Sequence, residues 1–274
     1  MQRKPSPRGL LIFVALLALV ATGCNKLKAR DELNKGVAQY KSAKFDRAIE
    51  HFQRAIELDP ELLNARLYLA TAYASQYIPG APSEENIRMG EQAVREFEKV
   101  LEVDPNNLSA LDGIGSILFN MGGNPFKPEL MERSKQFHMK HIQIKPDDPE
   151  PYYWVGVINW TLAYRQNKEL RAEYNRRNPN RQVKDVDPLP VSLREQFARS
   201  HGAMVDEGIR HLEKAIELNP QYDEAMAYLN LLYRQKADQV TSEQEREQYI
   251  AKAEALVDKV KEVRQMKEAA APTS

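Results

Sequence analysis

The stretch Ala55-Ile56-Glu57-Leu58-Asp59-Pro60 decides the fold, because it returns almost unchanged as Ala215-Ile216-Glu217-Leu218-Asn219-Pro220. Two related stretches lie between them, Leu101-Glu102-Val103-Asp104-Pro105 and Ile142-Gln143-Ile144-Lys145-Pro146. Each has the pattern of an amphipathic helix end followed by a proline, which cannot continue a helix. A helix that keeps ending in the same way indicates an internal repeat and predicts an array of helical units.

Small and aromatic residues recur ahead of these prolines. The first unit has Gly36, Tyr40, Ala48, Phe52, Ala55 and Pro60; the second has Leu69, Ala70, Tyr73, Ala93, Phe97 and Pro105. Three further units over residues 114–260 follow the pattern more weakly. The pattern resembles the tetratricopeptide repeat (TPR), a 34-residue helix–turn–helix unit whose helices touch at small residues. The resemblance covers roughly residues 29 to 265 and implies an all-α fold, an α-solenoid of about five units.

The proline spacing departs from this family and predicts inserts in units 2, 3 and 4. Pro60, Pro105, Pro146 and Pro220 are 45, 41 and 74 residues apart. The excess lies between the two helices of each unit, at residues 75–83, 120–127 and about 165–191. Ser83 is expected to cap the helix after the first insert, and Pro128 to occupy a first helical position after the second.

The third insert is the most distinctive one. We expect the first helix of the fourth unit to extend to about Arg177 and the chain to break at residues 178–180. A capping box at Ser192–Glu195 would then open a long helix that ends before Pro220. One degenerate repeat is the alternative interpretation of this insert. The last helix is expected to begin at a second capping box, at Ser242, and to run to about Ala270, with residues 271–274 disordered.

The N-terminus has the pattern of an export signal. Arg3, Lys4 and Arg8 precede an apolar run from Leu10 to Ala21. The run is shorter than the ~20 residues that a membrane-spanning helix needs. This pattern predicts a signal peptide over residues 1–23.

Cys24 is the single cysteine of the chain, so it has no intramolecular disulfide partner. Ala21-Thr22-Gly23-Cys24 resembles the lipobox of bacterial lipoproteins, in which the cysteine is acylated and becomes the new N-terminus. The resemblance implies lipidation at Cys24, a tether over residues 24–30 and a repeat domain over residues 31–270. Asn25 favours the periplasmic face of the outer membrane over inner-membrane retention. A plain cleaved signal with an incidental cysteine is the alternative.

The charge balance argues against a nucleic-acid partner. Without residues 1–23 the chain holds 36 basic and 39 acidic residues. A near-neutral protein lacks the basic surface that nucleic-acid binding needs.

The family resemblance also implies a partner-binding groove, lined by the first helix of each unit. Transferred to this sequence, the groove positions are Leu33, Val37 and Tyr40, then Asn64, Leu67 and Thr71, then Asp112, Ser116 and Phe119, then Tyr153, Val157 and Trp160, and finally Leu231 and Arg234. Tyr153 and Trp160 are the expected anchors, because aromatic residues dominate protein interfaces. The alternative for Trp160 and Phe119 is packing under the inserts. Leu33 and Val37 stand where carboxylate-clamp co-chaperones have lysine and asparagine, which argues against that subfamily.

A basic cluster lies within the third insert, formed by Arg165, Lys168, Arg171, Arg176, Arg177, Arg181 and Lys184. It could meet anionic lipid or an acidic partner. A solvated insert surface is the favoured interpretation.

Catalytic and cofactor signatures are not found in the sequence. His138 and His141 lie three residues apart, a spacing that suits metal ligation, but they occupy packing positions of the repeat. No phosphate loop, catalytic serine motif or zinc signature occurs. We therefore expect a non-enzymatic scaffold without a cofactor or metal.

The expected function is a lipid-anchored scaffold of the bacterial cell envelope that binds a protein or peptide, in envelope assembly, secretion or a pilus-related complex. Two alternatives remain open. One is a small-molecule-binding or catalytic subunit with a pocket built by the long insert, and the other is a purely structural oligomer.

Overall fold

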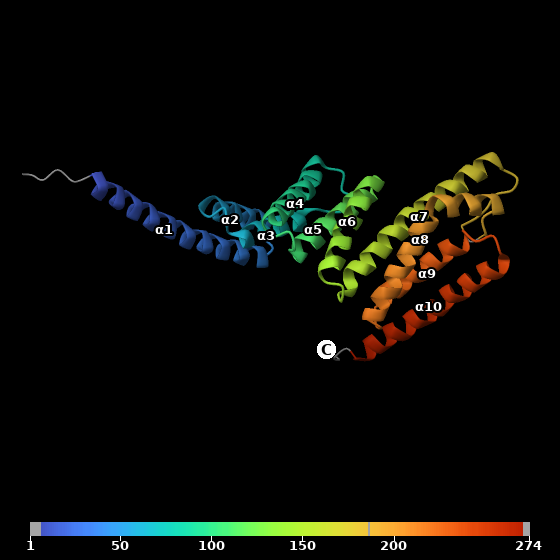
Figure 1. The fold of residues 1–274 in the computed structure, drawn as a ribbon. Coiled ribbons are helices and arrows are strands. Elements are labelled where there is room, and N and C mark those ends of the chain that lie inside the picture. Colours follow the sequence, from blue (N-terminus) through green and yellow to red (C-terminus); the bar gives the residue numbers. More distant parts are fainter. Residues whose placement is uncertain (1–6, 186, 271–274) are drawn as a thin grey trace, which may run out of the picture. The chain divides into compact units, whose positions relative to one another are not determined.

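The computed structural model describes residues 7–185 and 187–270, with side chains from Cys24 onward. Every regular element in this part of the chain is an α-helix (Figure 1). The chain divides into two compact units, Met1–Pro125 and Phe126–Ser274. The predicted all-α class, with helices in antiparallel TPR-like pairs, is confirmed. The start of the predicted signal peptide and the predicted tail at residues 271–274 lie outside the described residues.

The first unit holds five helices. They are α1 (Pro7–Lys41), α2 (Phe45–Leu58), α3 (Leu63–Gln76), α4 (Glu84–Val103) and α5 (Leu108–Gly123). Helix α1 packs against α2 and α3 against α4, as the two helices of successive repeats should, and α4 also contacts α5. Residues 24–30, for which a tether is predicted, lie within α1, and Ala29 is buried. None of the helices in the described residues is both long and apolar enough to cross a bilayer.

Small residues let the paired helices of this unit approach closely. A Cβ atom placed on Gly36 of α1 would lie 2.5 Å from Phe52 Cδ1 of α2. A Cβ atom on Gly113 of α5 would lie 2.6 Å from Phe97 of α4. Aromatic rings therefore fill the space that the glycines leave, as expected for close-packed helix pairs.

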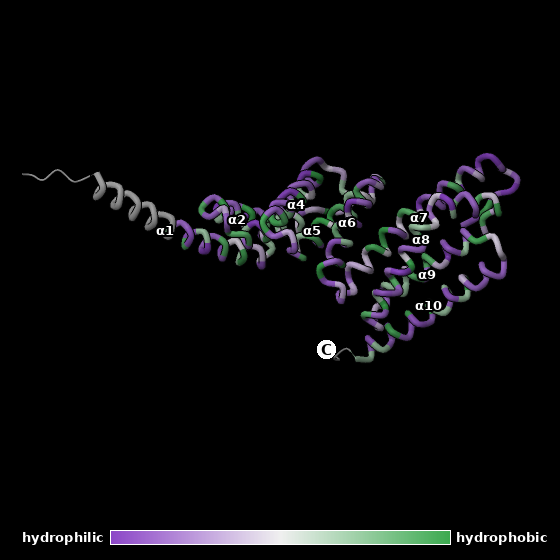
Figure 2. The backbone as a smooth tube through the Cα atoms, viewed as in Figure 1, coloured by the Kyte–Doolittle hydropathy of each residue, from purple (hydrophilic) through white to green (hydrophobic). Residues whose placement is uncertain are grey.

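The second unit holds the other five helices of the described chain. They are α6 (Pro128–Ile144), α7 (Pro149–Arg177), α8 (Val191–Leu218), α9 (Asp223–Ala237) and α10 (Glu243–Ala270). Helix α7 packs against α8, α9 against α10, and α7 also contacts α9. Hydrophilic and hydrophobic stretches alternate along these helices (Figure 2), as expected for helices with one buried face. The core between them includes Phe197, Leu212 and Leu232.

Most of the predicted helix starts are correct. Ser83 accepts a hydrogen bond from the Asn86 N–H at 3.2 Å and caps α4, and Pro128 is the first residue of α6. Ser242 accepts a hydrogen bond from the Glu245 N–H at 3.3 Å at the start of α10. The capping box predicted at Ser192 is wrong. Pro190 is the N-cap of α8, and Ser192 lies inside the first turn.

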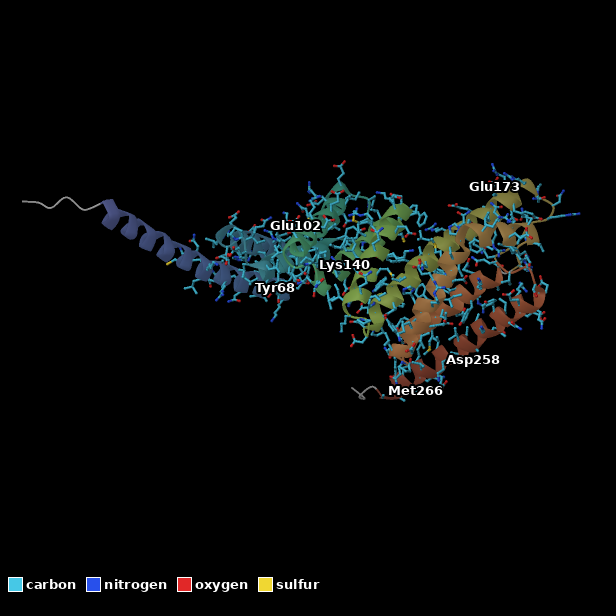
Figure 3. The ribbon with its side chains drawn as sticks, in the orientation of Figure 1. Tyr68, Glu102, Lys140, Glu173, Asp258 and Met266 are labelled. Atoms are coloured by element: carbon cyan, nitrogen blue, oxygen red, sulfur yellow. The ribbon has the colours of Figure 1, made fainter. Side chains whose placement is uncertain are left out.

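The long insert combines an extended α7 with the loop of residues 178–190. Helix α7 ends at Arg177, as predicted, and Glu173 lies near this end, far from Met266 at the other end of the unit (Figure 3). A side chain of α7 holds the loop in place. The buried Arg171 donates hydrogen bonds to the Lys184 carbonyl at 2.6 Å and to the Asp187 carbonyl at 2.8 Å. The described residues of the insert therefore pack as part of the second unit.

Candidate binding surface on helices α7 and α9

Five aromatic side chains of the second unit form one continuous set, which we call the aromatic surface. Its members are Tyr153, Trp160 and Tyr164 on α7, Tyr228 on α9, and Tyr222 at the N-cap of α9. The ring of Tyr153 lies 5.1 Å from that of Tyr222 and 5.7 Å from that of Tyr228. Trp160 lies 5.3 Å from Tyr228 and stacks on Tyr164 at 5.1 Å. The surface therefore joins the first helices of two successive repeats.

Helix geometry explains how these residues come together. Tyr153, Trp160 and Tyr164 are seven and four residues apart, so the helical period places them on one face of α7. Figure 1 shows α7 and α9 running in the same direction. The two helices are in contact, and the ring of Tyr228 on α9 lies against those of Tyr153 and Trp160. Ring centroids separated by 4.5–7 Å are favourable contacts, worth roughly 1 kcal/mol each beyond the area they bury.

Most rings of the aromatic surface pack against the hydrophobic core of the unit, and all of them are still partly exposed to solvent. Tyr164 is 37% exposed, and the other four rings are half-buried. Burial, helped by Tyr228 and Glu224, raises the pKa of Tyr153 to about 12. Burial and nearby carboxylates also raise the pKa of Tyr222 well above its usual range. Both hydroxyls are therefore neutral at physiological pH and can donate hydrogen bonds to a ligand.

The structure brings some of the predicted groove residues of this unit together. Tyr153 and Trp160 lie on the aromatic surface, and Leu231 on α9 is half-buried. Arg234 is exposed, and its Nε donates a hydrogen bond to the Asn230 side chain at 3.0 Å. Val157 does not line the groove as predicted, because it is only 1% exposed and belongs to the core. The contact between α7 and its neighbours covers this position, and one helix alone does not reveal that contact.

Three residues of the aromatic surface were missed by the transferred groove positions: Tyr164, Tyr222 and Tyr228. Tyr164 lies four residues after Trp160, so helical spacing alone could have found it. Tyr222 and Tyr228 could not be found in this way, because their role depends on the packing of α9 against α7.

In the first unit the predicted groove residues lie on α1, α3 and α5. Leu33, Val37 and Tyr40 are half-buried on α1, and the Tyr40 hydroxyl forms a 2.9 Å hydrogen bond with Ser75. On α3, Asn64 is exposed, Leu67 is half-buried, and Thr71 donates a hydrogen bond to the Leu67 carbonyl at 2.8 Å. On α5, Asp112, Ser116 and Phe119 are half-buried. Their role in binding stays a prediction.

The basic cluster predicted in the insert is partly neutralised by ion pairs. Arg171 is 4% exposed and pairs with Asp238 at 2.6 Å, so it is a core residue and not part of a surface patch. Lys168 pairs with Asp185 at 2.7 Å, and Arg176 and Arg177 both pair with Glu173. Arg165 is exposed and lies 5.2 Å from the Phe126 ring, while Arg181 and Lys184 are exposed. These pairs reduce the positive charge that an acidic partner or lipid would meet.

The two histidines lie in packing positions. His138 and His141 are both buried on α6, and the ring of His138 stacks on Trp154 at 5.9 Å. Within the described residues, no group of three or more histidine, cysteine, aspartate or glutamate side chains could hold a metal ion.

The insert also lines a hollow of about 460 Å³ between α7 and α8. Leu170 and Leu193 form its apolar part, and Glu169, Tyr174 and Arg177 belong to its polar part. Arg177 is already paired with Glu173, so part of this polar lining is satisfied within the protein.

Successive antiparallel helix pairs that approach closely at glycines place this fold in the class of helical-repeat proteins. The family model described as tetratricopeptide repeat matches residues 30–62. The match covers the C-terminal part of α1 and the whole of α2, and further antiparallel helix pairs follow it in the chain.

Solved TPR-like structures share this fold. A crystal structure of MamA matches with a TM-score of 0.56 at 16% identity, over 85% of this chain and 93% of the other. MamA from Desulfovibrio magneticus RS-1 matches with a TM-score of 0.53 at 15% identity, over 84% and 96%. YrrB, described as a TPR protein with an unusual peptide-binding site, matches with a TM-score of 0.51 at 14% identity, over 86% and 90%. A comparison with curated proteins finds no match.

Proposed function

We propose that this protein is a non-catalytic scaffold that binds a protein or peptide partner on the aromatic surface of α7 and α9. We further propose that a lipid on Cys24 holds it at the membrane of a bacterial cell envelope. The aromatic surface carries the first part of the proposal, and the lipobox-like sequence carries the second.

Three properties of the aromatic surface suit a binding role. It is built on helices, which hold side chains more firmly than loops do. Its rings are large and rigid, and they combine an apolar body with hydroxyl and indole donors, as interface anchors usually do. It also lies on the first helices of two repeats, where the TPR resemblance places the groove.

Photo-crosslinking tests the binding role. Tyr164 is replaced by p-benzoyl-phenylalanine in the full, membrane-associated chain, because Tyr164 is the most accessible member of the surface. The matched control has the same residue in place of Glu254, which is exposed on α10. We expect one envelope protein, identified by mass spectrometry, to be captured from position 164 and not from 254.

A second variant links that adduct to the surface. Tyr228→Ala removes the ring that contacts both Tyr153 and Trp160, and it should reduce the adduct severalfold. The proposal is contradicted if position 164 yields only self-adducts or no adduct while circular dichroism shows an intact helical fold. Self-adducts alone would favour the structural oligomer.

Membrane fractionation tests the anchor. Cys24 is exposed on α1, so an acyl chain at this position meets no packing conflict with the described residues. Two or more acyl chains give stable membrane attachment. We expect the wild type in the membrane fraction and Cys24→Ser in the soluble fraction. Equal partition of the two would contradict lipidation.

The hollow between α7 and α8 gives the small-molecule alternative a definite location. Native mass spectrometry of the purified chain tests that function. A retained small molecule that is lost in Leu193→Glu but kept in wild type would favour it over the scaffold.

A further inference from the structure

Two carboxylates flank one end of the aromatic surface. Glu150 precedes Tyr153 by three residues on α7, and Glu224 precedes Tyr228 by four residues on α9. Residues three or four positions apart share a helix face. The contact between Tyr153 and Tyr228 therefore brings two acid–tyrosine pairs together from neighbouring helices. Both glutamates are exposed.

The charges around this end are mainly negative. Glu150, Glu224 and Asp148 all raise the pKa of Tyr222, and Glu224 also raises that of Tyr153. Three cationic side chains lie nearby, and each is bound to an aspartate. Lys145 is bound to Asp148 at 3.1 Å, and Arg264 and Lys267 of α10 are bound to Asp223.

The two glutamates differ in how much of their charge is available. Arg264 lies close enough to Glu224 for the carboxylate to raise the pKa of the guanidinium, so part of the Glu224 charge is already balanced within the protein. Glu150 stands at the start of α7, where its backbone N–H is bound by the Asp148 side chain at 3.1 Å. We assign the larger role to Glu150, because its carboxylate is exposed in the first turn of α7.

We propose that the end of the aromatic surface formed by Tyr153, Tyr222 and Tyr228, with Glu150 and Glu224 at its edge, binds an arginine or lysine side chain of the partner. This inference rests on the proposed binding function and names the chemistry of the bound segment. A cation over a tyrosine face is attracted by the ring, and a carboxylate at the rim completes its charge. Arginine suits the site best, because its planar guanidinium stacks on rings while it donates hydrogen bonds to a carboxylate.

Charged and neutral versions of one peptide test the inference. The probes are a fluorescein-labelled tri-arginine peptide, the isosteric tri-citrulline peptide and a tri-glutamate peptide, titrated with the full chain and followed by anisotropy. We expect saturable binding of tri-arginine, at least tenfold weaker binding of tri-citrulline and no binding of tri-glutamate. Because the carboxylates are exposed, tri-arginine binding should also weaken as salt rises from 0.05 to 0.5 M.

Charge-neutral variants locate the binding site. Glu150→Gln should weaken tri-arginine binding by roughly twofold to fivefold, as expected for the loss of one exposed ion pair. Tyr228→Ala should weaken it at least as much. The matched control, Glu254→Gln, removes the same charge from the exposed face of α10 and should leave binding unchanged. Glu150→Gln leaves the Asp223 cluster intact, so its effect does not depend on the docking of α10.

The possible outcomes separate this inference from the proposed function. Equal effects of Glu150→Gln and Glu254→Gln, or equal binding of tri-arginine and tri-citrulline, would overturn the cation site. If the adduct at position 164 persists at wild-type level in Glu150→Gln, the proposed binding surface is retained and the proposed contact with a basic side chain is rejected. If no adduct forms at position 164 even with Glu150 in place, both the proposed binding surface and the cation site are rejected.

Discussion

Gly156 shows what a single missing side chain contributes to the second unit. A Cβ atom at this position of α7 would lie 2.6 Å from Leu212 Cδ2, on a residue of α8 that is fully buried. Glycine usually weakens a helix by roughly 1 kcal/mol relative to alanine. Here close packing of α7 against α8 outweighs that propensity.

We therefore expect opposite effects from two glycine substitutions. Gly156→Ala should lower the free energy of unfolding by roughly 1–3 kcal/mol, because Leu212 must move in a packed core. Gly202→Ala, in the middle of α8, should raise it by up to about 1 kcal/mol, because the nearest atom to its Cβ is 3.9 Å away. Urea unfolding followed by circular dichroism measures both, and equal changes would contradict this account.

His138 makes the stability of the second unit depend on pH. Burial, with a smaller effect of His141, lowers its pKa from the ordinary 6.5 to about 4. Between these values the unfolded chain binds a proton that the folded chain does not. The free energy of unfolding that depends on His138 is therefore highest above pH 6.5. It decreases by up to about 3 kcal/mol as the pH falls towards 4.

The variant His138→Phe tests this dependence, because phenylalanine keeps a ring against Trp154 and cannot titrate. The free energy of unfolding of wild type, measured at pH 7 and at pH 4.5, should fall more than that of His138→Phe. Parallel losses in the two proteins would show that other groups cause the acid sensitivity.

At the scale of helices, the sequence predicted much of the fold. The recurring prolines marked the ends of α2, α4, α6 and α8, and the extension of α7 to Arg177 was expected from the length of the insert. The start of α8 was misplaced, because the Ser192–Glu195 pattern competes with Pro190, whose carbonyl accepts the N–H of Leu193 and of Arg194 at 2.9 and 3.0 Å.

The candidate site was predicted less well, and for a physical reason. Tyr153 and Trp160 were expected from the groove positions that the family resemblance implies. Whether a position faces solvent depends on neighbouring helices. That is why Val157 and Arg171 were placed outside while the structure buries them, and why Tyr228 was missed.

The buried Arg171 predicts how the insert is held. Its guanidinium joins α7, the insert loop and Asp238 after α9, and its side chain is only 5% exposed. Arg171→Met should cost roughly 3 kcal/mol, because Asp238, whose side chain is only 15% exposed, loses this cation and keeps the hydrogen bond from the Asn167 side chain. The loop should also become sensitive to limited proteolysis at residues 178–190.

The control for this prediction is Arg176→Met, which removes an exposed partner of Glu173 from the same helix. Exposed ion pairs contribute roughly 0–1 kcal/mol, so this variant should behave almost as wild type. Similar losses in the two variants would mean that the insert is not fixed by the buried pair. The double variant Arg171→Met, Asp238→Leu should recover part of the lost stability.

At the scale of the whole molecule, repeat architecture predicts local stability, because each repeat contacts mainly its neighbours. Gly36→Ala should force Phe52 to move, since the new Cβ would lie 2.5 Å from Phe52 Cδ1. Hydrogen exchange should then quicken in α1 and α2 by roughly tenfold or more. Exchange in α8, α9 and α10 should stay at the wild-type rate, and a uniform increase throughout the chain would contradict this locality.

The placement of the aromatic side chains has a spectroscopic consequence. The protein has two tryptophans, Trp154 and Trp160, and both lie on α7 within two turns of each other. Tryptophan fluorescence excited at 295 nm therefore comes from the second unit alone. Trp160 belongs to the aromatic surface, whereas Trp154 stacks on His138 and also contacts Tyr153 at 5.4 Å. Quenching by protonation of His138 should come from Trp154, whereas a bound peptide can affect both indoles, and a Trp154→Phe variant would isolate the response of Trp160.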